Sequence, residues 1–258
     1  MEELNFYRYK LDIEYDGVPY CGFQLQYEEG LKTIEGELLR AISSFANFST
    51  KITASGRTDA GVHAIKQTIN FDLPKKYNSH QIIMGLNYYL KEEKICVLDA
   101  ILVDRNFSAR FDAKMRYYRY IILNRKAPAI IDKNRLWHIG GKKLSVLAMQ
   151  NASQYLIGEH DFSAFRAAEC QARSPVRTMH RIEVRRVGDL VAVSLRANAF
   201  LHHMVRNIVG SLIQVGNGNR PPEWIAELLK GRDRELAAPT FSPYGLYLAR
   251  VDYDARWG

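Results

Sequence analysis

The stretch YRYKLDIEY at residues 7–15 determines how the N-terminal part of the chain begins to fold. Aromatic and aliphatic side chains occupy every second position from Tyr7 to Tyr15, and charged side chains occupy the positions between them. Because successive side chains of a strand point to opposite faces of a sheet, this alternation predicts a half-buried β-strand. The pair Asp16-Gly17 then breaks the strand.

The segments that follow this strand predict the order βαββαβ. Thr33 is suited to cap a helix in which apolar residues recur every three or four positions. The expected elements are, in order, that helix, β-prone runs at 50–54 and 65–71, a helix at 79–90 and a strand at 94–103. This order is the split βαβ arrangement of ferredoxin-like folds.

The second half of the chain repeats the same order. Its expected elements are a strand at 115–123, a helix at 144–157, a hairpin of strands 178–187 and 190–197, helices at 203–215 and from Pro221-Pro222 to Gly231, and a strand at 246–253. We therefore expect an α/β (α+β) protein of two ferredoxin-like halves, residues 1–106 and 107–258. The halves should form a mixed, mainly antiparallel sheet with helices packed on it, and a central cleft between them is the default place for a site.

Composition excludes several classes of protein. The chain has 258 residues, of which 47% are hydrophobic and 25% charged, as in ordinary globular proteins. It has no apolar run of the ~18 residues that a membrane span needs, and with two early acidic residues and no apolar run at its start we expect no secretory signal. Its three cysteines lie far apart, which argues against a disulfide framework and favours the reducing cytoplasm.

The distribution of charge indicates a polyanionic partner. The net charge is +8, and it divides into −3 for residues 1–106 and +11 for residues 107–258. Six arginines but only two acidic residues occur between residues 165 and 186. A solvated basic surface is one explanation, but arginine favours phosphate forks and base stacking. This pattern favours a nucleic acid as the partner.

The stretch SGRTDAGVH at residues 55–63 is the strongest candidate for chemistry. Two glycines flank Arg57, Thr58 and Asp59 in a loop between two predicted strands. In the simplest interpretation Asp59 caps a turn and Arg57 is exposed. Alternatively, Arg57 keeps the Asp59 carboxylate ionised, as a nucleophile requires.

The sequence SGRTDAGVHA at residues 55–64 resembles the signature loop of the tRNA pseudouridine synthase A family. Further blocks agree with the family in the same order: IEYDG at 13–17, FSARFDA at 107–113, YRY at 118–120, DFSAF at 161–165, NAFLHHMVRNIVGSL at 198–212, WIAELL at 224–229 and GLYL at 245–248. Two positions depart from the family's usual pattern, because Phe23 replaces a tryptophan and Lys91 replaces a proline. Neither departure touches the expected chemistry.

The resemblance implies an isomerase that converts uridine to pseudouridine in the anticodon stem-loop of tRNA, at positions 38, 39 and 40. It implies no cofactor and no metal, and a homodimer whose two subunits share one tRNA. Asp59 matches the catalytic aspartate, and Tyr118 matches the tyrosine that packs against the target base. Arg57 belongs to the signature loop, Arg206 resembles the arginine that pairs with the carboxylate, and Leu246 resembles the apolar residue lining the uracil pocket.

Physical reasoning adds three expectations to the resemblance. The target nucleotide must be turned out of its stack before a side chain can reach it, and Tyr118 then stacks on the base. Asp59 attacks either the ribose C1′ or the uracil ring, and the sequence leaves that choice open. His63 orders the loop or contacts RNA, whereas Arg166, Arg173 and Arg177 are expected to contact the RNA backbone.

Two other functions compete with this interpretation. A non-catalytic RNA-binding or chaperone protein would need only the basic and aromatic surface, and would not depend on Asp59. A hydrolase that cleaves a glycosidic bond usually needs two carboxylates with divided roles, and the signature loop offers only one.

Overall fold

The computed structural model describes residues 5–26, 28 and 30–257. The chain divides into two compact units, one made of Met1–Lys114 with Leu248–Gly258 and the other of Met115–Tyr247. The C-terminal residues therefore belong with the first unit, whereas the sequence predicts that they are part of the second half, residues 107–258. Within the described residues no helix is long and apolar enough to cross a membrane.

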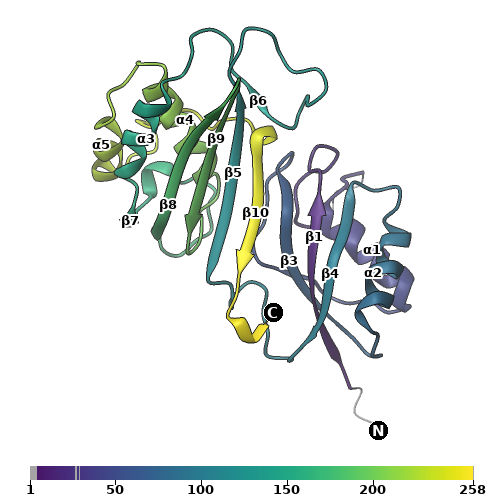
Figure 1. Cartoon of the computed structure of the whole chain (residues 1–258). Helices are drawn as coiled ribbons and strands as arrows, with labels where there is room; N and C mark the ends of the chain where they lie inside the picture. The colour runs from purple at the N-terminus through teal and green to yellow at the C-terminus, as the bar shows by residue number, and fades with distance from the viewer. Residues whose placement is uncertain (1–4, 27, 29, 258) are drawn as a thin grey trace. The chain divides into compact units, whose positions relative to one another are not determined.

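The first unit contains the predicted βαββαβ order (Figure 1). Its elements are β1 (Tyr7–Tyr15), α1 (Ile34–Ala46), β2 (Thr53–Ala54), β3 (His63–Leu73), α2 (Ser79–Tyr89) and β4 (Ile95–Val103). Strand β1 lies between β4 and β3 and runs antiparallel to both, and β2 pairs with β3. Both helices cover the same face of this sheet (Figure 1).

Local capping fixes where the two helices begin. The Thr33 hydroxyl accepts a hydrogen bond from Gly36 N at 3.2 Å, so Thr33 is the N-cap of α1 as predicted. Asn78 and Gln81 form a reciprocal capping box at the start of α2. Each cap satisfies backbone N–H groups that have no partner inside the helix.

The middle of the second face of β1 is buried as well, although Glu14 on that face is exposed, so the strand is more deeply buried than the predicted half-buried strand. Lys10 and Asp12 on that face are 4% and 6% exposed. Lys10 Nζ donates to the carbonyl of Trp257 at 2.9 Å and lies 5.2 Å from the Tyr253 ring centroid, so the C-terminal segment covers this face. Burial lowers the pKa of the Lys10 amine. The Asp12 carboxylate accepts a hydrogen bond from the Thr68 hydroxyl at 2.6 Å.

The second unit has the predicted elements and two short strands besides. Its elements are β5 (Met115–Leu123), β6 (Trp137–His138), α3 (Val146–Gln154), β7 (Gly158–Asp161), β8 (Val176–Val187), β9 (Leu190–Ala197), α4 (Met204–Gly216) and α5 (Trp224–Gly231). Strands β5, β9, β8 and β7 pair antiparallel in that order, and β6 runs parallel to β5. The pairing is therefore mixed and mainly antiparallel, as expected. Strand β10 (Leu246–Asp252) leads the chain back into the first unit.

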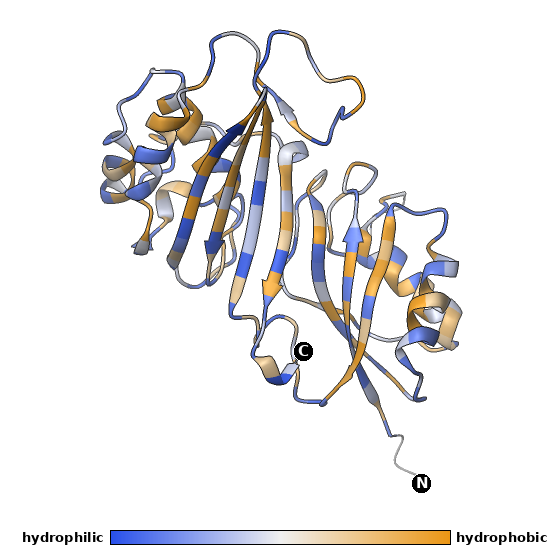
Figure 2. Ribbon diagram, in the orientation of Figure 1, coloured by the Kyte–Doolittle hydropathy of each residue, from blue (hydrophilic) through white to orange (hydrophobic). Residues whose placement is uncertain are grey.

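The sheet of the second unit has two different faces. Hydrophilic and hydrophobic residues alternate along its strands (Figure 2). Tyr120, Val193 and Val184 are in register on neighbouring strands and are buried on the face that α3 and α4 cover. Their sequence neighbours Arg119 and Ser194 point to the opposite face, which no described helix covers (Figure 1).

Candidate functional site

The loop that carries Asp59 connects β2 to β3 in the first unit, and side chains on both sides anchor it. The Ser55 hydroxyl donates to the Gln67 side-chain oxygen, and Gln67 Nε2 donates to the carbonyl of Gly56 at 2.7 Å. At the other side, the Thr58 hydroxyl is bonded at 2.7 Å to the Tyr15 hydroxyl. The loop therefore has a fixed start and a fixed centre.

Two glycines allow neighbouring backbone to approach this loop. A Cβ added at Gly17 would lie 2.0 Å from the carbonyl oxygen of Val62, and one added at Gly22 would lie 3.1 Å from that of Thr58. Val62 N in turn donates to the carbonyl of Asp59 at 3.1 Å. Because only glycine permits such contacts, Gly17 and Gly22 allow neighbouring backbone to pack tightly against the loop on both sides of Asp59.

The side chains of this loop differ in exposure. Thr58 is buried, Asp59 is half-buried and Arg57 is exposed. The loop therefore presents a carboxylate at its surface from a backbone that cannot easily move. That Arg57 keeps Asp59 ionised stays a prediction.

His63 orders the region that Asp59 depends on. Its Nδ1 accepts a hydrogen bond from Gly17 N at 3.2 Å and lies 3.1 Å from the Asp16 carboxylate. The His63 side chain is 3% exposed, which leaves almost none of the ring for a substrate. Of the two roles considered from the sequence, the ordering role fits this position and an RNA contact does not.

Tyr118 lies at the centre of β5 in the second unit. It is in register with Leu195 of β9 and is half-buried. Its ring meets that of Phe200 edge to face, with centroids 4.9 Å apart and planes at 78°. Phe200 lies within the NAFLHHMVRNIVGSL block, but nothing in the sequence marks it as a partner of Tyr118. Phe200 is therefore an additional candidate, because it sets the plane of the Tyr118 ring.

Arg206 and the segment that ends in Leu246 both lie near Tyr120 of β5. Arg206, on α4, is half-buried, and its Nε donates to the carbonyl of Phe241 at 2.6 Å. The Tyr120 hydroxyl donates to the carbonyl of Ser242 at 2.7 Å, and burial raises the pKa of Tyr120 while the Arg206 charge opposes the rise. The 241–246 segment thus joins α4 to β5 and ends in Leu246, which is buried.

The predicted RNA-contacting arginines are in different surroundings. Arg173 is exposed. Arg166 donates to the carbonyl of Cys170 at 2.6 Å, and Arg177 donates to the carbonyls of Ser174 and Val176 at 2.9 and 2.6 Å. Burial lowers the pKa of Arg177. These bonds brace the 166–177 segment, so Arg173 offers the most accessible charge of the three.

Comparison with known proteins identifies the family. The sequence profile of the family described as "tRNA pseudouridine synthase" matches residues 13–112 and 152–254. The chain is 46% identical to tRNA pseudouridine synthase A of Janthinobacterium sp. (strain Marseille), over 97% of this chain and 93% of that protein. It is 47% identical to the protein of the same name from Nitrosococcus oceani, over 95% of this chain and 93% of that one. The chain belongs to the tRNA pseudouridine synthase family.

Asp59, Arg206 and Leu246 all fall inside the residues that the profile of the tRNA pseudouridine synthase family matches, whereas Tyr118 falls between its two segments. A solved structure, "Crystal Structure of a Cbf5-Nop10-Gar1 Complex", superposes with a TM-score of 0.37 at 13% identity, over 80% of this chain and 45% of that chain. That likeness is too low to support an argument. Family membership makes the chain one of the isomerases of RNA nucleosides.

Proposed function

We propose that this chain converts uridine to pseudouridine in tRNA, with the carboxylate of Asp59 as the nucleophile and uridines 38, 39 and 40 of the anticodon stem-loop as targets. The observation that carries the proposal is the half-buried Asp59 on a loop that buried neighbours hold on both sides, within the family's signature sequence. A nucleophile held in a fixed position is already oriented for attack, which lowers the entropic part of the activation barrier.

The reaction is an isomerisation, so its atoms balance within the nucleoside. The bond between N1 of uracil and C1′ of ribose breaks, the base turns, and a bond between C5 and C1′ forms. C5 loses a proton and N1 gains one. The Asp59 carboxylate bonds to the nucleoside, at C1′ or at the ring, and is released unchanged when the new bond forms. The uracil must stay in place while it turns, which requires surroundings that exclude water.

The second unit supplies the groups that hold the base in this proposal. Tyr118, with its ring plane set by Phe200, stacks on the turned-out uracil. Arg206 pairs with the carboxylate, Leu246 lines the uracil pocket, and Arg57 keeps Asp59 ionised. Arg166, Arg173 and Arg177 contact the RNA backbone, which follows from the excess of arginine in this segment. The enzyme acts in the cytoplasm as a homodimer.

The experiment is to incubate unmodified tRNA with the purified chain and to map pseudouridine at each position. We expect pseudouridine at positions 38, 39 and 40 of tRNAs that carry uridine there, and an equal yield in EDTA. If the RNA is bound but no pseudouridine forms, the non-catalytic RNA-binding alternative replaces the proposal. If free uracil accumulates instead, the hydrolase alternative does.

A further inference from the structure

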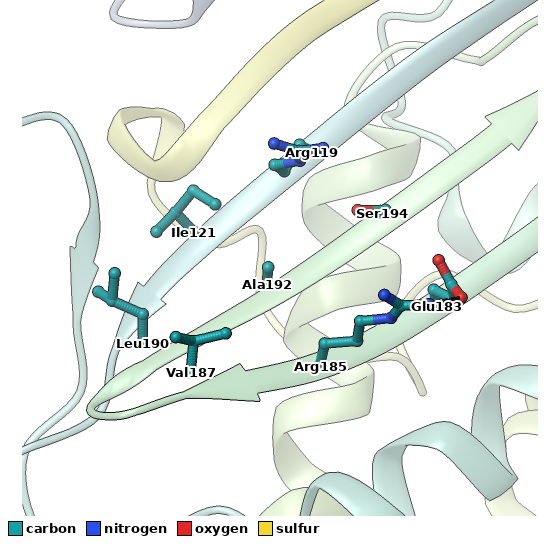
Figure 3. A pocket seen from close by; sticks show the side chains of 8 residues that line it. All are labelled: Arg119, Ile121, Glu183, Arg185, Val187, Leu190, Ala192 and Ser194. Atoms are coloured by element: carbon teal, nitrogen blue, oxygen red, sulfur yellow. Dashed lines mark hydrogen bonds and ion pairs between the residues drawn. The ribbon is translucent and has the colours of Figure 1, made fainter.

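The uncovered face of the second unit's sheet holds a shallow hollow of about 280 Å³ that lies across β5, β9 and β8 (Figure 3). We call this face the open sheet face. Side chains in cross-strand register line it, from β5 through β9 to β8: Arg119, Ser194 and Glu183 in one row, and Ile121, Ala192 and Arg185 in the next. None of these residues has a role in the proposed reaction.

The charged part of the open sheet face consists of a carboxylate held between two arginines. Glu183 Oε1 accepts a hydrogen bond from Arg181 and another from Arg185, each at 2.7 Å. One carboxylate oxygen thus lies between two guanidinium groups whose side chains are 62% and 71% exposed. Those hydrogen bonds hold the pKa of Glu183 below its usual value. A phosphate oxygen could replace the carboxylate oxygen, since arginine forks bind both groups.

Further arginines extend this positive surface across the strands. Arg119 of β5 is exposed in the same row as Glu183, and Arg196 of β9 pairs in register with Arg181. The Arg196 guanidinium lies 5.5 Å from the centroid of the Tyr117 ring, an arrangement in which an aromatic ring and a charge share one surface. Arg119 and Arg196 therefore lie on the same face as the Arg181–Glu183–Arg185 cluster.

The other end of the same face is apolar. Val187 and Leu190, beside the β8–β9 turn, are 76% and 40% exposed and are in register with each other. A nucleic acid strand presents phosphates along one side and apolar base or ribose surface along the other. RNA-binding modules use the open face of a sheet in this way, with charge and rings facing the strand.

We propose that the open sheet face is an accessory RNA-binding surface, on which Arg119, Arg181 and Arg185 hold backbone phosphates of the tRNA away from its reacting nucleotide. The proposal rests on the proposed function for the identity of the RNA. The excess of arginine favours RNA as the occupant, because guanidinium groups bind backbone phosphates through both charge and paired hydrogen bonds.

Glu183→Gln and the double variant Arg181→Gln/Arg185→Gln give opposite predictions. The glutamate competes with phosphate for both guanidinium groups. Its removal should therefore strengthen tRNA binding about two- to threefold and steepen the dependence of log Kd on log salt. The double variant should weaken binding at least about fivefold near 0.15 M salt and reduce that slope by about two. The kcat at saturating tRNA should stay at the wild-type value.

Lys143→Gln/Lys230→Gln is the matched control. It removes the same charge at two exposed positions, of which Lys230 lies in α5 on the helical side of the unit. We expect its salt slope to stay near that of the wild type. Equal slopes for the two double variants, or weaker binding by Glu183→Gln, would overturn the proposal. A changed oligomeric state with unchanged tRNA binding would overturn it in favour of a second copy of the chain on this face.

These readouts separate the two proposals. If the wild-type chain binds tRNA with the expected salt slopes but forms no pseudouridine, only the proposed function fails. If pseudouridine forms at the wild-type rate and the slopes do not respond, only the accessory surface fails.

Discussion

Gly17→Ala tests whether the backbone around Asp59 must stay where it is. A Cβ at residue 17 would lie 2.0 Å from the carbonyl oxygen and 2.6 Å from the carbonyl carbon of Val62. Contacts of real Cβ atoms under 3.0 Å are essentially never seen, so one side has to move by about 1 Å. Because Val62 N donates to the backbone carbonyl of Asp59, we expect that movement to shift the backbone that carries the carboxylate.

The expected cost has two parts. Forcing an extra methyl into packed backbone should lower the free energy of unfolding by about 1–3 kcal/mol. A displacement of about 1 Å at the nucleophile should lower kcat about 100-fold. Urea unfolding measures the first quantity, and pseudouridine formation under saturating tRNA measures the second.

Gly56→Ala is the control for stability, because a Cβ at that position of the same loop would have no heavy atom within 4 Å. Its free energy of unfolding should stay within about 0.5 kcal/mol of the wild type. If Gly17→Ala unfolds at the same urea concentration as Gly56→Ala and keeps the wild-type kcat, the argument for a fixed loop is wrong.

Three further predictions follow from other contacts. Tyr118→Ala should lose a stacking energy of about 1–3 kcal/mol for the one stacked base, which lowers kcat/KM for tRNA about 5- to 150-fold in steady-state assays. Tyr118→Phe keeps the ring and should keep most of the wild-type kcat/KM. Burial alone would raise the pKa of Glu93, but hydrogen bonds from Lys32 and Tyr20 bring it below the ordinary value. The stability that Glu93 contributes is therefore present above pH 4.5 and lost as the pH falls through the lowered pKa. In urea unfolding across pH 3–6, the free energy of unfolding of Glu93→Gln should depend less on pH than that of the wild type. An equal pH dependence in the two proteins would contradict this prediction. Dialysis against EDTA should leave the rate of pseudouridine formation unchanged, and a loss restored by a divalent metal would refute the expected metal-free reaction.

Periodicity in the sequence was sufficient for the long elements. Strands 7–15, 115–123 and 190–197 match β1, β5 and β9, because each is long enough for alternation to show. The short strands β6 and β7 were missed, since elements of two and four residues contain too few positions to show a period. The order of elements was therefore predictable and the additions to it were not.

Burial that depends on distant segments could not be predicted from a local pattern. Lys10 occupies a position that is normally exposed, and it is buried because residues from the far end of the chain pack over it. The same dependence placed Leu248–Gly258 in the first unit. Alternation reports which side chains share a face and does not report what covers it.

The loop that carries Asp59 could be singled out from the sequence, whereas its surroundings could not. The loop with Asp59 and its glycines stood out because few loops combine these residue types at this spacing. Contacts between distant segments could not be predicted: the Phe200 ring meets Tyr118 only because the chain folds them together. The six arginines between residues 165 and 186 also include Arg186, which donates a hydrogen bond to the side-chain oxygen of Asn124 inside the second unit. Counting arginines in the sequence therefore does not show which of them are available to RNA.

Tritium release from tRNA labelled at C5 of uridine tests the role of Asp59 most directly, because the label leaves only when the C5 proton is lost. Asp59→Asn removes the negative charge and keeps the size of the side chain, and Asp189→Asn makes the same change in the exposed β8–β9 turn. We predict no release by Asp59→Asn with tRNA binding retained, and wild-type release by Asp189→Asn. Sustained release by Asp59→Asn would contradict the assignment of the nucleophile.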